Sequence, residues 1–203
     1  MTDDVRRSAS RRKILLLAAL FALPVIIAYV LYFSGWRPAA TGNHGELVQP
    51  PRLIADAALT RLDGGSMRFS GLHGKWTLIT FSPADCLKPC ERNLYVMRQV
   101  IAAQGDKAGR VQSALVVTDT KALELLRYTV KDYPGMHVIV GPPQAVAELA
   151  RQFTLPAGSP LDGLNRVYLV DPLGNFMMSY PADADPNGIR KDLSRLLRAS
   201  RIG

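Results

Sequence analysis

Residues 76–90 have the sequence WTLITFSPADCLKPC. The first six residues form an apolar run rich in β-forming side chains, which predicts a short strand buried on both faces. The only two cysteines of the chain, Cys86 and Cys90, follow this run. Pro89 between them suits the first turn of a helix, where the missing N–H is not needed. We therefore expect both cysteines at a turn from a buried strand into a helix.

The rest of the chain after this turn alternates between helical and extended apolar patterns. Expected helices cover residues 93–103, 120–133, 142–153 and 189–198, and expected strands cover 113–117, 136–140, 166–170 and 176–180. A small hairpin, with strands at 59–62 and 67–69, is expected before the buried strand. This order predicts an α/β sandwich with a mixed sheet.

An uncharged stretch of twenty residues, Ile14 to Phe33, precedes this domain. A helix of that length spans about 30 Å, the thickness of the hydrocarbon core of a bilayer. A cleaved signal peptide is the alternative, but its apolar region is shorter and ends at a small-residue cleavage site. The sequence therefore predicts an uncleaved transmembrane anchor.

The charges around the anchor predict its orientation. Five basic residues precede it, whereas only Arg37 follows it closely. The positive-inside rule then places residues 1–13 in the cytoplasm and the rest of the chain outside, which in a bacterium means an inner-membrane protein with a periplasmic domain. The net charge of +8 falls to +5 once residues 1–33 are removed, and no basic run remains, so nucleic acid is not an expected partner.

Gly and Pro are frequent in residues 34–51, which we interpret as a linker that contains His44. The predicted organisation is a cytoplasmic N-terminus (1–13), a transmembrane anchor (14–33), a linker (34–51) and one folded domain (52–203).

The spacing of the cysteines limits what they can do. Side chains four positions apart on one helical turn can form a disulfide or bind one metal ion between two thiolates, an arrangement that Cu(I) accepts. The helix dipole and Lys88 both favour a thiolate at this position. A purely structural disulfide is the alternative, but a five-residue loop would stabilise the fold by only about 2 kcal/mol. These considerations favour a redox or metal-binding role for Cys86 and Cys90.

The segment LHGKWTLITFSPADCLKPC (72–90), followed by VYLVDPLGNF (167–176), resembles the Sco/SenC family. The resemblance implies a thioredoxin-like three-layer sandwich with a mixed sheet, behind one transmembrane helix. It also implies a role in assembling the copper centre of cytochrome c oxidase. Cys86 and Cys90 then match the two thiols of the family, as catalytic residues and as ligands of Cu(I), and a respiratory oxidase subunit or a protein thiol–disulfide partner is implied.

Two positions depart from the family pattern. Glu91 stands where the family usually has a proline, and Gly163 stands where the family has its third copper ligand, a histidine. No substitute ligand is evident in the sequence. The remaining candidates have simpler interpretations as surface, strand or core residues; they are Asp85, His73, His137, Met136, Met177 and Met178.

The sequence thus predicts a membrane-anchored, exported protein acting in thiol–disulfide exchange, Cu(I) handling, or both. In such exchange we expect Cys86, as the earlier and more exposed sulfur, to attack and Cys90 to resolve the mixed disulfide. A general exported disulfide reductase without copper is one alternative. An anchored interaction protein with a structural disulfide is the other. The sequence contains no Ser/His/Asp set, no phosphate-binding glycine loop and no cluster with zinc-ligand spacing.

Overall fold

The computed structural model describes residues 2–34, 42–200 and 202, and divides the chain into two compact units, residues 1–42 and 43–203. The first unit contains helix α1 (Thr2–Phe33). Its segment Arg11–Phe33 is long and apolar enough to cross a membrane, and it includes the predicted anchor, 14–33.

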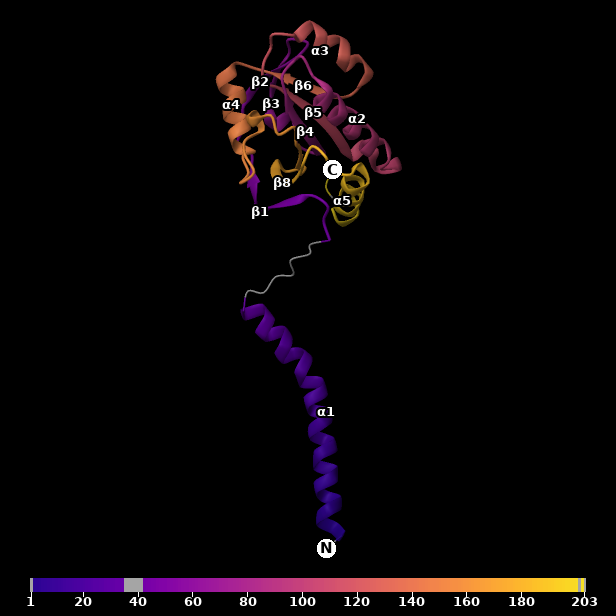
Figure 1. Ribbon diagram of the computed structural model, residues 1–203. Coiled ribbons are helices and arrows are strands. Elements are labelled where there is room, and N and C mark those ends of the chain that lie inside the picture. The colour runs from indigo at the N-terminus through magenta and orange to yellow at the C-terminus, as the bar shows by residue number, and fades with distance from the viewer. Residues whose placement is uncertain (1, 35–41, 201, 203) are drawn as a thin grey trace. The chain divides into compact units, whose positions relative to one another are not determined.

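The second unit is built on one eight-stranded sheet with the strand order β1-β8-β7-β4-β5-β6-β2-β3 (Figure 1). Its strands are β1 (Glu46–Leu53), β2 (Ala58–Arg61), β3 (Ser66–Arg68), β4 (Trp76–Ser82), β5 (Val111–Val117), β6 (His137–Val140), β7 (Val167–Val170) and β8 (Asn175–Tyr180). Strands β4, β5 and β6 are parallel to one another, and the other pairs are antiparallel. The sheet is therefore mixed, as the sequence predicts.

Four α-helices cover the two faces of this sheet: α2 (Lys88–Ala102), α3 (Leu123–Thr129), α4 (Pro143–Gln152) and α5 (Pro186–Ala199). Helices α2, α3 and α5 cover one face, and α4 covers the other (Figure 1). All seven residues of β4 are buried, and its neighbours Leu78 and Ile79 belong to opposite clusters of the core. The predicted three-layer sandwich is confirmed.

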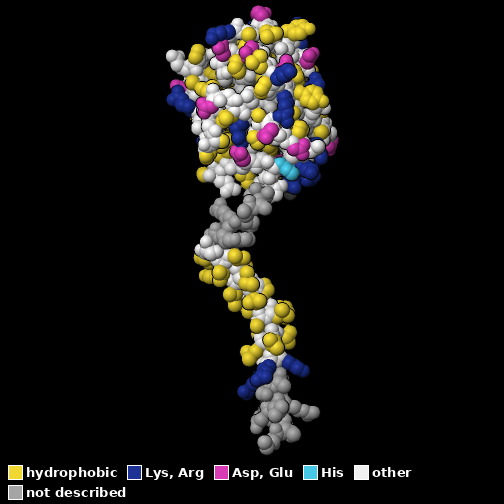
Figure 2. All heavy atoms as spheres, in the orientation of Figure 1, with side chains coloured by type: hydrophobic (Ala, Val, Ile, Leu, Met, Phe, Trp, Pro, Cys, Tyr) yellow, Lys and Arg dark blue, Asp and Glu magenta, His cyan; other side chains and the backbone are white. Residues whose placement is uncertain are grey.

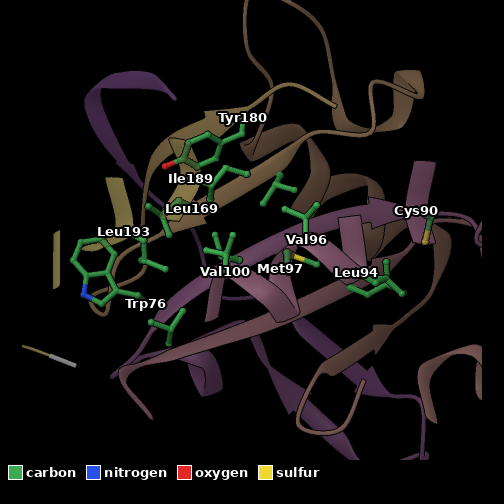
Figure 3. Packing of buried hydrophobic residues seen from close by; sticks show 14 of the residues in the cluster. Trp76, Cys90, Leu94, Val96, Met97, Val100, Leu169, Tyr180, Ile189 and Leu193 are labelled. Carbon is green, nitrogen blue, oxygen red and sulfur yellow. The ribbon is translucent and has the colours of Figure 1, made fainter. Parts of the chain in front are cut away.

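The two core clusters differ in composition. The cluster beneath α4 is aromatic: Phe153 and Tyr168 contact each other, and each contacts the rings of Phe81 and Phe176, at centroid distances of 5.0–5.7 Å. The cluster beneath α2 and α5 is mainly aliphatic and includes Cys90. Figure 3 shows Cys90 at one end of this cluster and Trp76 at the other.

The structure differs from the sequence-based prediction at two elements. The helix expected over 120–133 is shorter, because α3 ends at Thr129 and a 3-10 turn, η3 (Val130–Asp132), follows. Part of the predicted linker, residues 46–51, forms β1. Pro50 and Pro51 are tolerated there because β1 is an edge strand whose register against β8 is interrupted between Leu47 and Arg52. Residues 35–41 of the predicted linker lie outside the described residues.

Candidate functional site

The two cysteines lie where the sequence places them, between the end of β4 and the first turn of α2. Cys86 precedes the helix by two residues, and Cys90 lies in its first turn, directly after Pro89. A disulfide joins them, with 5.0 Å between their Cα atoms. The backbone N–H of Cys90 donates to the carbonyl of Leu87 at 2.8 Å, which closes the turn around the pair.

The loop that carries Cys86 is held against the end of β5. The backbone N–H of Ala84 donates to the carbonyl of Asp119 at 2.8 Å, and the N–H of Cys86 donates to the carbonyl of Pro83 at 3.2 Å. A hydrogen bond from the backbone N–H of Lys121 holds the pKa of Asp119 below its usual value. The site thus lies at the carboxyl end of the parallel strands, where ligand and catalytic sites of α/β sheets are commonly found.

Both cysteines are almost fully buried. The exposed fraction of each is 2%, whereas Leu87 between them is 66% exposed. The expectation that Cys86 is the more exposed sulfur is therefore not met, and exposure gives no order of attack. A hollow of about 270 Å³ lies beside the loop, lined by Ala84, Asp85 and Asp119 among others, but neither cysteine lines it. Thiol exchange at this disulfide requires the loop before α2 to move.

The backbone of Cys86 adopts an unfavourable conformation. Its φ is +40°, in the left-handed region, which costs a residue with a side chain about 1 kcal/mol or more. Glycine would avoid this cost, but it could not form the disulfide. We expect reduction to free Cys86 from the five-residue ring and to let this strain relax, which would favour the reduced state.

The loop containing Gly163 is fixed to α2 one turn beyond Cys90. The buried side chain of Asn93 donates through Nδ2 to the carbonyl of Asn165 at 2.8 Å and to Oγ1 of Thr80 at 3.1 Å. Gly163 ends the 3-10 turn η4 (Pro160–Asp162), and it is exposed. Sequence reasoning missed Asn93, although its position three residues after Cys90 places both side chains on the same face of the helix.

The two histidines considered as substitute ligands lie at the opposite end of the sheet. His73 precedes β4, and its ring packs over Gly174. His137 begins β6, its Nε2 lies 3.2 Å from Oε1 of Gln112, and burial lowers its pKa below the usual value. The cysteines follow the carboxyl end of β4. His73 precedes this strand, which spans about 20 Å, and the ring of His137 faces Gln112, which pairs with Thr77 near the start of β4. Neither histidine is therefore brought to the sulfurs.

The remaining candidate ligands are also accounted for. Met178 is buried and accepts a hydrogen bond from Tyr180 at 2.9 Å, and Met177 lines a hollow next to Trp76. Met136 directly precedes β6, at the same end of the sheet as His137. Asp85 is exposed beside Cys86. Among the described residues, no group of three or more His, Cys, Asp or Glu side chains is arranged to hold a metal ion.

Comparison with protein families gives one match, to the family described as "Transmembrane-like, thioredoxin-like, C-terminal domain", over residues 76–200. No curated protein matches the chain.

Several solved structures resemble the chain. Copper-bound ScoI of Bradyrhizobium japonicum is 22% identical, with a TM-score of 0.57, over 70% of this chain and 98% of that one. Apo Sco1 of Thermus thermophilus is 23% identical, with a TM-score of 0.61, over 80% and 99%. BsSco, a Sco-family protein described as having a disulfide switch, is 15% identical, with a TM-score of 0.58, over 74% and 96%. The predicted thioredoxin-like fold, and the resemblance to Sco proteins at the level of fold, are confirmed.

Proposed function

We propose a function for this chain, which belongs to the family of transmembrane-like, thioredoxin-like C-terminal domains. It is a membrane-anchored protein that carries out thiol–disulfide exchange and also handles Cu(I) during cytochrome c oxidase assembly. One observation carries the redox part of the proposal. The only two cysteines form a disulfide across a five-residue loop at the start of a helix, where the bond adds little stability to the fold. Of the two, Cys86 has a strained backbone, with a positive φ, whereas Cys90 is helical.

The proposed redox cycle transfers two electrons from the chain to a target disulfide. The thiolate of one cysteine attacks a target sulfur, forms a mixed disulfide and releases the first target thiolate. The second cysteine thiolate then attacks the sulfur of its partner and releases the second target thiolate. This leaves the target reduced and the Cys86–Cys90 disulfide formed. An exported thiol reductant must reduce the pair again before the next cycle.

Copper enters the proposal as cargo. Two thiolates four residues apart provide soft, two-coordinate ligation, which suits Cu(I). Copper-bound Sco structures of the same fold support this part of the proposal. Gly163 has no side chain that could bind a metal where the family has a histidine. This argues against stable Cu(II) binding, because Cu(II) prefers additional nitrogen and oxygen ligands.

The location proposed for the chain is the bacterial inner membrane, with the N-terminus in the cytoplasm and the domain in the periplasm. The apolar helix at Arg11–Phe33 and the five basic residues before its apolar core support this orientation. A disulfide is also expected to persist in the periplasm and to be reduced in the cytosol.

A copper-free exported disulfide reductase is the second candidate, and the missing histidine at Gly163 is the observation that favours it. Titration of the reduced chain with Cu(I), in competition with a Cu(I)-binding dye, separates the two candidates. We expect one Cu(I) per chain, with binding lost in Cys86→Ser and in Cys90→Ser. Failure of the unaltered chain to bind Cu(I) would remove copper from the function and leave the reductase.

A further inference from the structure

Helix α5 presents a cationic face to solvent. Ile189, Leu193 and Leu197 on one side of the helix are buried against the sheet. On the opposite side, three exposed cations lie at a helical spacing that places them in one stripe. These are Lys191, Arg195 and Arg198, which we call the α5 cation stripe. In Figure 2, Lys and Arg side chains at the lower right of the globular unit adjoin a histidine, with Asp and Glu side chains close by.

Acidic side chains pair with one member of this stripe, Arg195. Asp192, the only acid within α5, is buried beside the stripe, and its Oδ1 lies 3.8 Å from Arg195. Asp185 lies at the other end of the helix, where it caps the N-terminus. Lys191 and Arg198 form no ion pair with any residue that the structure describes.

The buried Asp192 fixes the start of the globular unit onto the same helix. Its Oδ2 accepts hydrogen bonds from the backbone N–H groups of His44 at 2.8 Å and Gly45 at 2.9 Å. Two glycines permit this close approach. A Cβ on Gly45 would lie 2.5 Å from the ring of Tyr180, and a Cβ on Gly188 would lie 2.8 Å from Cβ of His44. The chain therefore enters the globular unit beside the α5 cation stripe.

The connection from this entry point to the apolar helix is short. Only residues 35–42 separate Ser34, directly after α1, from Asn43, where the globular unit begins. A fully extended chain of this length spans about 30 Å at most. If α1 crosses a membrane, as the proposed function holds, the entry point beside α5 cannot lie farther than this from the end of the membrane span.

From these observations we infer that the α5 cation stripe docks on anionic phospholipid headgroups of the membrane that holds α1. Guanidinium groups bind phosphate oxygens in a bidentate manner, and a lysine adds a point charge. Each cation near an anionic membrane surface contributes about a five-fold preference for the bound state, so that Lys191 and Arg198, which form no ion pair with a described residue, together contribute about 25-fold. The short connection keeps the stripe at high local concentration over the lipid.

Docking through α5 keeps the disulfide away from the lipid. Gln104, just beyond the end of α2, contacts α5 through the carbonyl of Arg190 at 3.5 Å and the hydroxyl of Ser194 at 2.8 Å. Cys90 lies at the other end of α2, fourteen residues earlier, and a helix of that length spans about 20 Å. The docked orientation thus leaves the cysteine loop open to a protein partner.

The test uses the full chain, labelled with ¹⁵N, in lipid nanodiscs. A docked domain tumbles with the disc and gives amide lines several-fold broader than those of a domain that moves on its tether. We expect broad lines in discs of phosphatidylcholine mixed with phosphatidylglycerol. Narrow lines are expected in phosphatidylcholine alone, and also in about 1 M NaCl, where the screening length falls to about 3 Å.

Two variants with equal loss of charge make the test specific. Lys191→Gln/Arg195→Gln/Arg198→Gln should give narrow lines in the anionic discs. The matched control, Lys121→Gln/Arg127→Gln/Lys131→Gln, removes three exposed cations in and around α3, at the other end of the globular unit (Figure 1), and should stay docked. Equal line widths in neutral and anionic discs, or equal loss of docking in both variants, would overturn the inference. A chain that does not insert into the discs at all would instead contradict the membrane anchor of the proposed function.

Discussion

Replacing Gly163 with histidine restores, at one position, the nitrogen ligand that the Sco/SenC resemblance leads one to expect. The structure allows the side chain sterically, because no heavy atom lies within 4 Å of a Cβ built at Gly163. The φ of +70° is less favourable for histidine than for glycine and costs about 1 kcal/mol. For a domain of this size, that cost lowers the melting temperature by about 3 °C. Gly163→His should therefore fold, with a small and measurable loss of stability.

The gain should appear in Cu(II) binding. Asn93, one turn beyond Cys90, fixes the loop of Gly163 to the helix that starts at the cysteines, and we expect a histidine on this loop to reach the thiolates. Removing a residue that only hydrogen-bonds to a metal ligand lowers the metal affinity of a site by about 10- to 100-fold. Adding a nitrogen that binds the metal directly should therefore raise the Cu(II) affinity by more than this. Titration of the reduced variant with Cu(II) should produce a thiolate-to-copper charge-transfer band. Electron paramagnetic resonance should show coupling to one nitrogen.

Gly64→His is the matched control. Gly64 also has a positive φ, +91°, and open space around its Cβ position, but it lies in the turn between β2 and β3. It should lower stability by a similar amount without the charge-transfer band. Equal Cu(II) affinity in the Gly163→His variant, the control and the unaltered chain would refute the assignment of Gly163 to the missing ligand position. Tight Cu(II) binding by the unaltered chain would reveal a ligand other than those considered above.

Three further outcomes are expected. Reduction of the Cys86–Cys90 disulfide should lower the free energy of unfolding by about 2 kcal/mol or less, because the closed loop is short; thermal denaturation with and without a phosphine reductant checks this, and unfolding on reduction would identify a structural bond. Asn93→Ala should lower the free energy of unfolding by about 2–3 kcal/mol, because it removes the hydrogen bonds of the buried Asn93 side chain to Thr80 and to the carbonyl of Asn165. A change below about 0.5 kcal/mol would show that these hydrogen bonds contribute little to stability. A reporter enzyme that is active only outside the cytoplasm, fused after Gly203, should be active, and neutralising the five basic residues before the anchor should weaken that orientation.

The position of the cysteines could be predicted from the sequence because local signals agree there. A continuous apolar run predicts the buried strand β4, and Pro89 marks the first turn of α2. Side-chain exposure could not be predicted, because the burial of Cys86 depends on the distant Asp119, whose carbonyl holds the loop.

Strand β1 was missed because its local composition points to a linker. Pro50 and Pro51 disfavour a strand, and only pairing with β8, more than 120 residues later, makes one. The α5 cation stripe was missed for a different reason. The net charge of the domain is modest and does not indicate a cationic surface. Only the helical spacing of Lys191, Arg195 and Arg198 indicates that they share one face.

The central claim is that Cys86 and Cys90 form a working redox pair. The reduction potential of their disulfide tests this most directly, measured by equilibrating the full chain with thiol–disulfide buffers and quantifying free thiols. We expect a value more positive than about −300 mV, because the ring is short and Cys86 is strained in the oxidised state. A value below about −300 mV would identify a structural bond that cellular thiols do not reduce, and would contradict the proposed function.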